Sequence, residues 1–567
     1  MNGPASGEDL GRETRETTDQ QVHHTETTTE EGGDPGGSPP FDLLEPVGPV
    51  GPAGRCSGYR PAMTAPLTRG ETRASRTSAV AALTAAELSS IVDLVVWVDE
   101  VEGARVAHAA SHLGTVRLRP GGIHEVLSGT DPIGSEDPMA FLPYAAEIEA
   151  EGPRTSMANA YPYAAERILS LFGDPTRSPD LAVVHTPRHF FPDEGGHVGE
   201  HGSLDVVQSR APLVLAGAGV RRLGYVERHA ALVDVGPTLA AQSGVPPENL
   251  RDAAGEPLDG RVLDAYLDVD VRPRAVVGIL WDGAHCGDLL HLAESGELPA
   301  VARLVERGAA LRGGAVAQFP SVTLTNHTSI LTGVGPGRHG VLGNVFYDRE
   351  TGERVVPNDE TTWHRSAEWL RPGLRTVFEM VADHVVFQGF PRTACIDEAI
   401  DRGSDFSTMK VIRESGSSDG AGGLNDRLPP AEQSPFLAEP AFLDDAYFRW
   451  GVRVDDLGLA QVHELFSDPA RMPRFTWWAN VVTDAGHHGG GPRSAMARDS
   501  LRQSDARLGV FLDHLAALGV IDDVAILLTA DHGFEGSDPA VTGSWRPALE
   551  SLGVPFRDEG PGFVYFL

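Results

Sequence analysis

Lysine is almost absent from this chain of 567 residues, in which Lys410 is the only one. Arginine therefore supplies nearly all of the 46 basic residues, which stand against 80 Asp and Glu residues and leave a formal net charge of −34. A chain this acidic is repelled by nucleic-acid phosphates and by anionic membranes unless a local basic patch intervenes. We therefore expect no nucleic-acid polymer and no membrane as a partner.

Cysteines and long hydrophobic runs are also scarce. The three cysteines, Cys56, Cys286 and Cys395, form neither a CxxC pair nor an even disulfide framework, so nothing requires an oxidising compartment. Apolar runs such as residues 91–98 fall short of the about 18 to 20 residues that a membrane-spanning helix needs. The amino-terminal residues lack the apolar core of a signal peptide. Together these absences predict a cytoplasmic protein.

The composition changes along the chain. Residues 1–88 are rich in Gly, Pro, Thr, Glu and Arg without a periodic apolar pattern, which predicts a disordered tail. From residue 89 onwards, short apolar runs alternate with longer helical stretches, and this predicts an α/β fold with a central, mostly parallel sheet flanked by helices. Residues 345–470 break this rhythm with loop-rich sequence and predict an insertion, or cap, that covers the site. The expected strands are 91–98, 181–185, 212–216, 275–281, 476–482 and 524–529, and the expected helices are 230–243, 289–307 and 496–518.

Acidic residues and histidines stand near the ends of three of these strands. Asp282 follows the first, Asp484 and His488 follow the second, and Asp531 and His532 follow the third. A single Asp at a strand end is ordinarily a turn former or a helix cap. The carboxyl ends of the strands in such a sheet form the usual ligand site, however, and mixed Asp and His side chains bind Zn²⁺ or Mn²⁺. The pattern therefore predicts a hydrolytic metal site.

A fourth segment, residues 319–344, reads FPSVTLTNHTSILTGVGPGRHGVLGN and supplies hydroxyl groups close to a predicted helix start. A hydroxyl at the amino end of a helix gains from the helix dipole, and a metal ion lowers its pKa further. Alternatively, these Ser and Thr residues only cap the helix that begins near Asn326.

This segment strongly resembles the nucleophile region of the type I phosphodiesterase/nucleotide pyrophosphatase family, within the alkaline phosphatase superfamily. The resemblance implies an alkaline-phosphatase-like core in which Thr323 is the nucleophile and Asn344 contacts the phosphoryl oxygens. The family's proline before Asn-His is Thr325 here, a mild departure. A sulfatase fits less well, because the Cys/Ser-x-Pro-x-Arg motif of that branch is absent.

The same resemblance implies two divalent metal ions, most simply zinc, with manganese as the alternative. The family's Asp-x-x-x-His-x-x-Gly-Pro motif reads here from Asp484 through His488 to Pro492. His487 is the rival of His488, and only the spacing decides between them. The implied ligands are Asp282, Thr323, Asp531 and His532 for one ion, and Asp484 and His488 for the other.

The third ligand of the second ion is missing from its usual place. In the family it is a histidine in a Gly-x-His-Gly segment after the Asp-His-Gly motif, but no histidine follows His532. A Gly-Glu-His-Gly segment that contains His201 lies upstream instead, and the residues after it resemble the closing part of the superfamily domain. The resemblance therefore makes His201 the third ligand.

This order predicts a circularly permuted domain. Residues 89–265 would form its usual carboxyl-terminal portion and residues 274–567 its usual amino-terminal portion, because metal ligands need proximity in space and not order in sequence. We expect His201 within metal-bridging reach of Asp484, and Leu567 near the start of the ordered chain. The alternative is two half-domains joined without sharing a site.

The predicted activity is hydrolysis of a small-molecule phosphate ester through a phosphothreonine intermediate at a two-metal site. Phosphodiesters, nucleotide pyrophosphates and related phosphomonoesters all remain open as substrates, and the sequence does not define an oligomeric state. A catalytically impaired metal-binding protein that kept the phosphatase fold is the alternative.

Overall fold

The computed structural model describes residues 69–149, 160–192, 195–359, 361–414, 424–560 and 562–567. The tail expected over residues 1–68 lies outside the described residues. Where the description begins, helix α1 (Arg69–Leu83) and a short 3-10 helix (Ala86–Leu88) replace the expected disorder, so the tail boundary at residue 88 is wrong. Ala79 and Leu83 are fully buried, which indicates that packing stabilises this helix.

A central eight-stranded sheet carries the site. Its strands lie in the order β17–β16–β18–β11–β19–β8–β12–β9, and every pairing is parallel except those of β8 with β19 and β12. The expected α/β fold with a mostly parallel sheet is therefore confirmed. The strands are β17 (Phe406–Ser407), β16 (Thr393–Ile396), β18 (Phe475–Asn480), β11 (Ala275–Trp281), β19 (Val524–Thr529), β8 (Leu213–Gly217), β12 (Gly308–Leu311) and β9 (Gly224–Val226).

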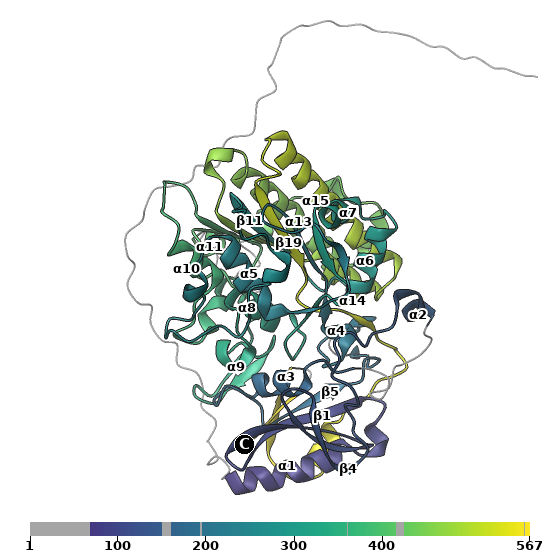
Figure 1. The fold of residues 1–567 in the computed structure, drawn as a ribbon. Helices are drawn as coiled ribbons and strands as arrows, with labels where there is room; N and C mark the ends of the chain where they lie inside the picture. The colour runs from purple at the N-terminus through teal and green to yellow at the C-terminus, as the bar shows by residue number, and fades with distance from the viewer. Residues whose placement is uncertain (1–68, 150–159, 193–194, 360, 415–423, 561) are drawn as a thin grey trace, which may run out of the picture. The chain divides into compact units, whose positions relative to one another are not determined.

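Two groups of helices flank this sheet. Figure 1 shows α5 and α8 on one side of β11 and β19, and α7 and α15 on the other. Even the 23-residue α15 contains no apolar stretch of membrane-spanning length, and the same holds for every other described helix. The first group is α5 (Val235–Gln242), α8 (Thr323–Thr332) and α10 (Val377–Ala382), and the second is α7 (Pro299–Glu306), α13 (Ala446–Leu465), α14 (Val482–Gly490) and α15 (Ala495–Ala517).

A second sheet of seven strands is antiparallel throughout, in the order β21–β22–β5–β1–β2–β3–β4. The strands expected at 91–98 and 181–185 belong to this sheet and not to the parallel one. One face of β1 packs against α3 (Ala164–Leu171) and the other against the cluster that contains Ala79, so residues 94–98 of β1 show the apolar run of a strand buried on both faces. The strands are β1 (Val92–Val101), β2 (Ala104–Ser111), β3 (Gly114–Arg119), β4 (Ile123–Gly129), β5 (Leu181–His185), β21 (Phe556–Glu559) and β22 (Phe563–Phe566).

Both predicted portions of the chain contribute to both sheets. From the earlier portion, β8 enters the central sheet between β19 and β12, and from the later portion, β22 pairs with β5 in the antiparallel sheet. Phe566 and Ile91 share one hydrophobic cluster, so the last strand packs beside the segment that begins near residue 91. The permutation itself stays a prediction.

Residues 345–470 are not a separate insertion throughout. Within them β16 pairs in parallel with β18, and β17 extends the central sheet to its edge. The expected helix 289–307 is interrupted: α6 (Cys286–Glu294) ends before Gly296, whose φ is +83°, and α7 begins at Pro299. The remaining elements are α2 (Tyr144–Glu149), α3 (Ala164–Leu171), α4 (Val206–Ser209), α9 (Pro336–His339), α11 (Thr408–Glu414), α16 (Arg546–Glu550), β6 (Gly199–Glu200), β7 (Arg210–Ala211), β10 (Ala230–Ala231), β13 (Ala315–Val316), β14 (Phe346–Asp348), β15 (Glu353–Val355) and β20 (Glu535–Gly536).

Candidate metal centre

Three parallel strands deliver their carboxylates to one edge of the central sheet. Strand β11 lies between β18 and β19, and their last residues are in register. Asp282 follows β11 directly, Asp484 lies in the first turn of α14 after β18, and Asp531 follows β19. The three apolar strands are fully buried, and the segment after each of them leaves the core at the same edge with an acidic side chain.

The first part of the centre is a buried group formed by Asp282, Asp531 and His532. The Nε2 atom of His532 lies 3.1 Å from Oδ2 of Asp531 and 3.7 Å from Oδ1 of Asp282. The backbone N–H of Gly283 donates to the other oxygen of Asp531, at 3.0 Å. This hydrogen bond fixes one carboxylate oxygen and leaves the other facing the histidine.

Asp484 and His488 lie one turn apart on α14, with Oδ2 and Nε2 separated by 3.5 Å. His488 donates its Nδ1 hydrogen to the carbonyl of Gly199, at 2.9 Å, which turns Nε2 towards Asp484. Tyr447 donates to the same Asp484 oxygen, at 2.8 Å. His487 instead donates to the carbonyl of its own helix and belongs to none of the ligand groups among the described residues. The structure thus places His488, and not its rival His487, beside Asp484.

His201 joins this second group from the opposite portion of the sequence. Its ligand atom lies within 4.8 Å of those of Asp484 and His488. Its ring stacks on that of His532, with centroids 3.6 Å apart. The Nδ1 hydrogen of His201 is donated to the carbonyl of Ser321, at 3.0 Å, so that Nε2 is the nitrogen left for a ligand. Residues more than 280 positions apart therefore face one another.

Thr323 is the first residue of α8 and is half-buried. The adjacent backbone N–H of Leu324 donates to Oδ1 of Asn344, at 3.1 Å, which leaves the amide hydrogens of Asn344 as donors beside the helix start. The hydroxyl of Ser321 donates to the carbonyl of Ser203, at 2.7 Å, and ties this loop to the segment that carries His201. Hydrogen bonds of Ser321 thus tie the segment that carries His201 to the loop just before the nucleophile candidate.

The donor set fits divalent cations. Several buried atoms that face the centre have no hydrogen-bond partner among the described residues. Tetrahedral ligand atoms about 2.1 Å from a zinc ion lie about 3.4 Å apart, and the separations given above run from 3.1 to 3.7 Å. Buried polar atoms without partners are costly unless a further group satisfies them. These atoms are Oδ1 of Asp282, Oδ1 of Asp484, Oδ2 of Asp531, Nε2 of His327 and Nε2 of His532.

Electrostatics point the same way. Burial, together with the negative charges of Asp531 and Asp484, raises the pKa of Asp282 well above its ordinary value. The charged form of Asp282 is therefore unfavourable beside the carboxylates of Asp531 and Asp484. Positive charge at the centre would stabilise all three as carboxylates.

Two features of the centre were not predicted from the sequence. His327, four residues after Thr323, lies within the group of Asp282 and Asp531, and the signal for it was this one-turn spacing on a predicted helix. His197 and Glu200 form a further group with His488. Nδ1 of His488 already donates its hydrogen to the Gly199 carbonyl, so only Nε2 is left to bind a metal ion. This one nitrogen cannot be a ligand both in this group and in the group that includes His201.

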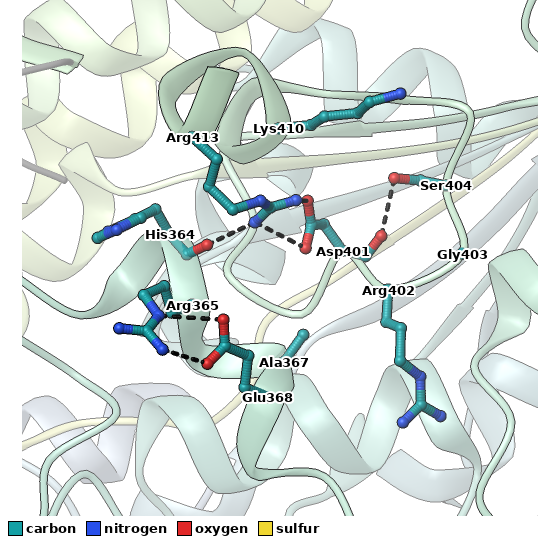
Figure 2. A pocket seen from close by; sticks show the side chains of 10 residues that line it. All are labelled: His364, Arg365, Ala367, Glu368, Asp401, Arg402, Gly403, Ser404, Lys410 and Arg413. Carbon is teal, nitrogen blue, oxygen red and sulfur yellow. Dashed lines mark hydrogen bonds and ion pairs between the residues drawn. The ribbon is translucent and has the colours of Figure 1, made fainter. Parts of the chain in front are cut away.

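A cavity of about 330 Å³ lies apart from these residues, and Figure 2 shows its lining. Within it, Arg413 pairs with Asp401 and Arg365 pairs with Glu368, so two of its cations are already neutralised. None of the predicted site residues lines this cavity. Its lining residues are His364, Arg365, Ala367, Glu368, Asp401, Arg402, Gly403, Ser404, Lys410 and Arg413.

Comparisons with known proteins cover part of the chain. Alkaline phosphatase PafA from Elizabethkingia meningoseptica is 35% identical over 91 residues, which are 16% of this chain and 17% of that protein. Ectonucleotide pyrophosphatase/phosphodiesterase 2 from Saccharomyces cerevisiae is 35% identical over 63 residues, which are 11% of this chain and 13% of that protein. The matches thus span less than a fifth of these curated relatives.

Among solved structures, phosphonoacetate hydrolase from Sinorhizobium meliloti 1021 in complex with phosphonoformate is 25% identical, with a TM-score of 0.29. Murine ectonucleotide pyrophosphatase/phosphodiesterase 5 in complex with AMP is 15% identical, with a TM-score of 0.30. Each alignment covers 46% of this chain and 57% of the other.

The fold and the centre define an α/β protein with a buried carboxylate–histidine site at the carboxyl ends of parallel strands. The model of the type I phosphodiesterase / nucleotide pyrophosphatase family matches residues 276–547. The match covers a little less than half of the chain and confirms the resemblance found in the sequence for this segment. The matched segment includes Asp282, Thr323 and Asp531 but not His201.

Proposed function

We propose that this protein is a metal-dependent hydrolase of small phosphate esters that acts through Thr323. The family match over residues 276–547 supports the class of reaction. The observation that carries the proposal is the convergence of buried, unsatisfied carboxylate and imidazole atoms at the strand ends. Three carboxylates buried this close repel one another, and cations bound between them would remove that repulsion.

The residues fall into two sets of ligands, as the family resemblance implies. When bound, two divalent cations, zinc or manganese, would polarise the phosphoryl oxygens and lower the pKa of a coordinated hydroxyl or water. His201 completes the second set from the earlier portion of the chain. The first set is Asp282, Thr323, Asp531 and His532, and the second is Asp484, His488 and His201.

The chain's own residues position and attack the ester. Thr323 Oγ lies at the amino end of α8, where the helix dipole favours negative charge. It gives up its proton to solvent and forms a bond to phosphorus, while the bond from phosphorus to the leaving oxygen breaks and that oxygen takes up a proton from solvent. The amide hydrogens of Asn344 donate to a non-bridging phosphoryl oxygen and stabilise the charge that develops there. Water then cleaves the phosphothreonine and restores the hydroxyl. The hydrogen bonds of Ser321 to His201 and Ser203 would hold the loop that precedes the attacking residue.

The substrate class stays broad within this proposal. Relatives with matching segments carry the names of a phosphatase and of a pyrophosphatase/phosphodiesterase, which supports phosphate esters in general. We propose phosphodiesters, nucleotide pyrophosphates or related phosphomonoesters as substrates.

Replacement of the nucleophile tests the proposal. Thr323→Ala should abolish turnover of chromogenic phosphate mono- and diesters while two metal ions per chain largely remain, and Thr323→Ser should keep measurable turnover because it retains a hydroxyl. Activity in Thr323→Ala equal to that of the unmodified protein would refute the assignment. Bound metals without turnover of any ester in the unmodified protein would instead support a metal-binding protein that kept the fold.

We also propose that the domain is circularly permuted. The position of β8 inside the central sheet and the position of His201 beside Asp484 support this order. A rearranged gene that encodes residues 274–567 before residues 89–265 should give a protein with the same two metal ions and the same turnover. A rearranged protein that folds but binds only one ion would contradict the permutation.

A further inference from the structure

His327 lies on the face of α8 that carries Thr323, one helical turn further along. Its side chain is buried, and Nε2 lies 3.7 Å from Oδ2 of Asp282 and 3.6 Å from Oδ2 of Asp531. These distances are too long for hydrogen bonds but within ion-pair range, and Nε2 has no hydrogen-bond partner among the described residues. They do match the separation of about 3.4 Å between atoms that share one tetrahedral zinc ion.

Glu398 holds this imidazole from behind. Its Oε2 accepts the Nδ1 hydrogen of His327 at 2.8 Å and the indole hydrogen of Trp477 at 3.0 Å. Its Oε1 accepts the backbone N–H of Ile400 at 2.9 Å. Because Oε2 of Glu398 accepts from Nδ1, that nitrogen carries a hydrogen, and Nε2 is the ring nitrogen that faces the two aspartates.

A carboxylate that accepts from a metal-bound histidine is a recurring arrangement, in which the acceptor fixes the tautomer and the orientation of the ring. Here each part of that arrangement is present: the fixed imidazole, the buried acceptor, and an Nε2 atom aimed at two buried carboxylates. We propose that His327 is a further ligand of the metal ion held by Asp282 and Asp531, and that Glu398 is its positioning residue. This proposal rests on the metal binding of the proposed function.

Glu398 lies in the loop between β16 and β17, within residues 345–470. The same loop supplies Asp401, Arg402, Gly403 and Ser404 to the cavity shown in Figure 2. The segment expected to be a cap would therefore contribute directly to holding the metal centre. Strands β16 and β17, which extend the central sheet, would thus hold the loop that positions Glu398.

Metal affinity and the visible spectrum of the cobalt-substituted protein test the proposal. In the chain of 567 residues, His327→Ala should weaken the binding of one of two ions at least tenfold and change the cobalt absorption bands, because one imidazole leaves the ligand set. Glu398→Gln should weaken the same ion by about tenfold to a hundredfold, since its side chain keeps the shape but offers one acceptor oxygen instead of two. His487→Ala is the matched control, because it removes a buried histidine outside the ligand groups and should leave both ions and the spectrum unchanged.

Competition with a chromophoric chelator measures the affinities, and circular dichroism checks that each variant folds. Unchanged affinity and an unchanged cobalt spectrum in folded His327→Ala would overturn the proposal. If that variant does not fold, wild-type affinity in folded Glu398→Gln would overturn it equally. Failure of the proposed function has a different signature: the unmodified protein would bind no metal, or Thr323→Ala would stay active.

Discussion

The contact between the His201 segment and α14 leaves no room for a side chain at Gly199. A Cβ atom built at this position would lie 2.2 Å from the carbonyl oxygen of His487 and 3.2 Å from Cα of Gly491. An ordinary C···O contact is about 3.3 Å, so the two backbones would have to separate by about 1 Å. No rotamer change relieves this clash, because the closest atom belongs to the main chain.

The magnitude follows from the groups that would move. Overpacking of this kind costs about 1 to 3 kcal/mol. The separation also weakens the bond from His488 to the Gly199 carbonyl, at 2.9 Å, and the bond from the Val198 N–H to the His488 carbonyl, at 3.1 Å, each contributing about 1 kcal/mol. We therefore expect Gly199→Ala to cost about 3 kcal/mol. If the second ion binds only to the docked segment, this cost lowers its affinity about a hundredfold.

Gly536 provides a matched control. It pairs directly with Gly199 between β20 and β6, and a Cβ atom there would meet no atom of the described residues within 4 Å. Metal content by mass spectrometry, thermal unfolding and ester turnover should show the loss in Gly199→Ala and not in Gly536→Ala. Equal metal affinity and equal melting temperature in the two variants would refute the docking that we describe.

Three further predictions concern the centre and the core. His488→Ala should lower metal affinity and turnover at least tenfold, whereas His487→Ala should keep both, as equilibrium dialysis and ester assays would show; the reverse order would exchange their roles. Burial lowers the pKa of His339 to about 3, below its unfolded value near 6.5. Between these two pH values only the unfolded chain takes up the proton, so the free energy of unfolding falls by about 1.4 kcal/mol for each pH unit below 6.5. Urea unfolding at pH 4.5 to 6.5 should therefore show a shallower loss in His339→Gln, and an identical slope would contradict the buried neutral imidazole. Gly278→Ala should destabilise the protein by about 1 to 3 kcal/mol, because its Cβ would lie 2.4 Å from the ring of Trp477, and an unchanged denaturation midpoint would contradict this packing.

The strand-end carboxylates could be predicted from sequence because their signal is local. Each follows a short apolar run, and a parallel sheet brings such ends together whatever the loops between them do. Asp282 and Asp531 needed no knowledge of tertiary contacts. The choice of His488 over His487 rested only on the spacing of the family motif. The structure adds the physical reason, because both lie in the last turn of α14 and the distant Gly199 carbonyl orients the ring of His488 towards Asp484.

The features that sequence reasoning missed depend on distant contacts. Strand β16 has only four residues, and its place in the central sheet comes from pairing with β18, about 80 positions later. Helix α1 has the composition of a tail, yet Ala79 and Leu83 are buried against residues from both ends of the described chain. His327 belongs to the motif that contains the candidate nucleophile. Its role as a candidate ligand depends on the distant residues Glu398, Asp282 and Asp531, which only the fold brings next to it.

The central claim is that residues from two distant portions of the chain form one two-metal hydrolytic site. Anomalous diffraction at the zinc edge, on crystals of the zinc-loaded protein, tests it most directly. We predict two peaks, one contacted by Asp282, Asp531 and His532 and the other by Asp484, His488 and His201. A single peak, or a second peak that His201 does not contact, would contradict the account.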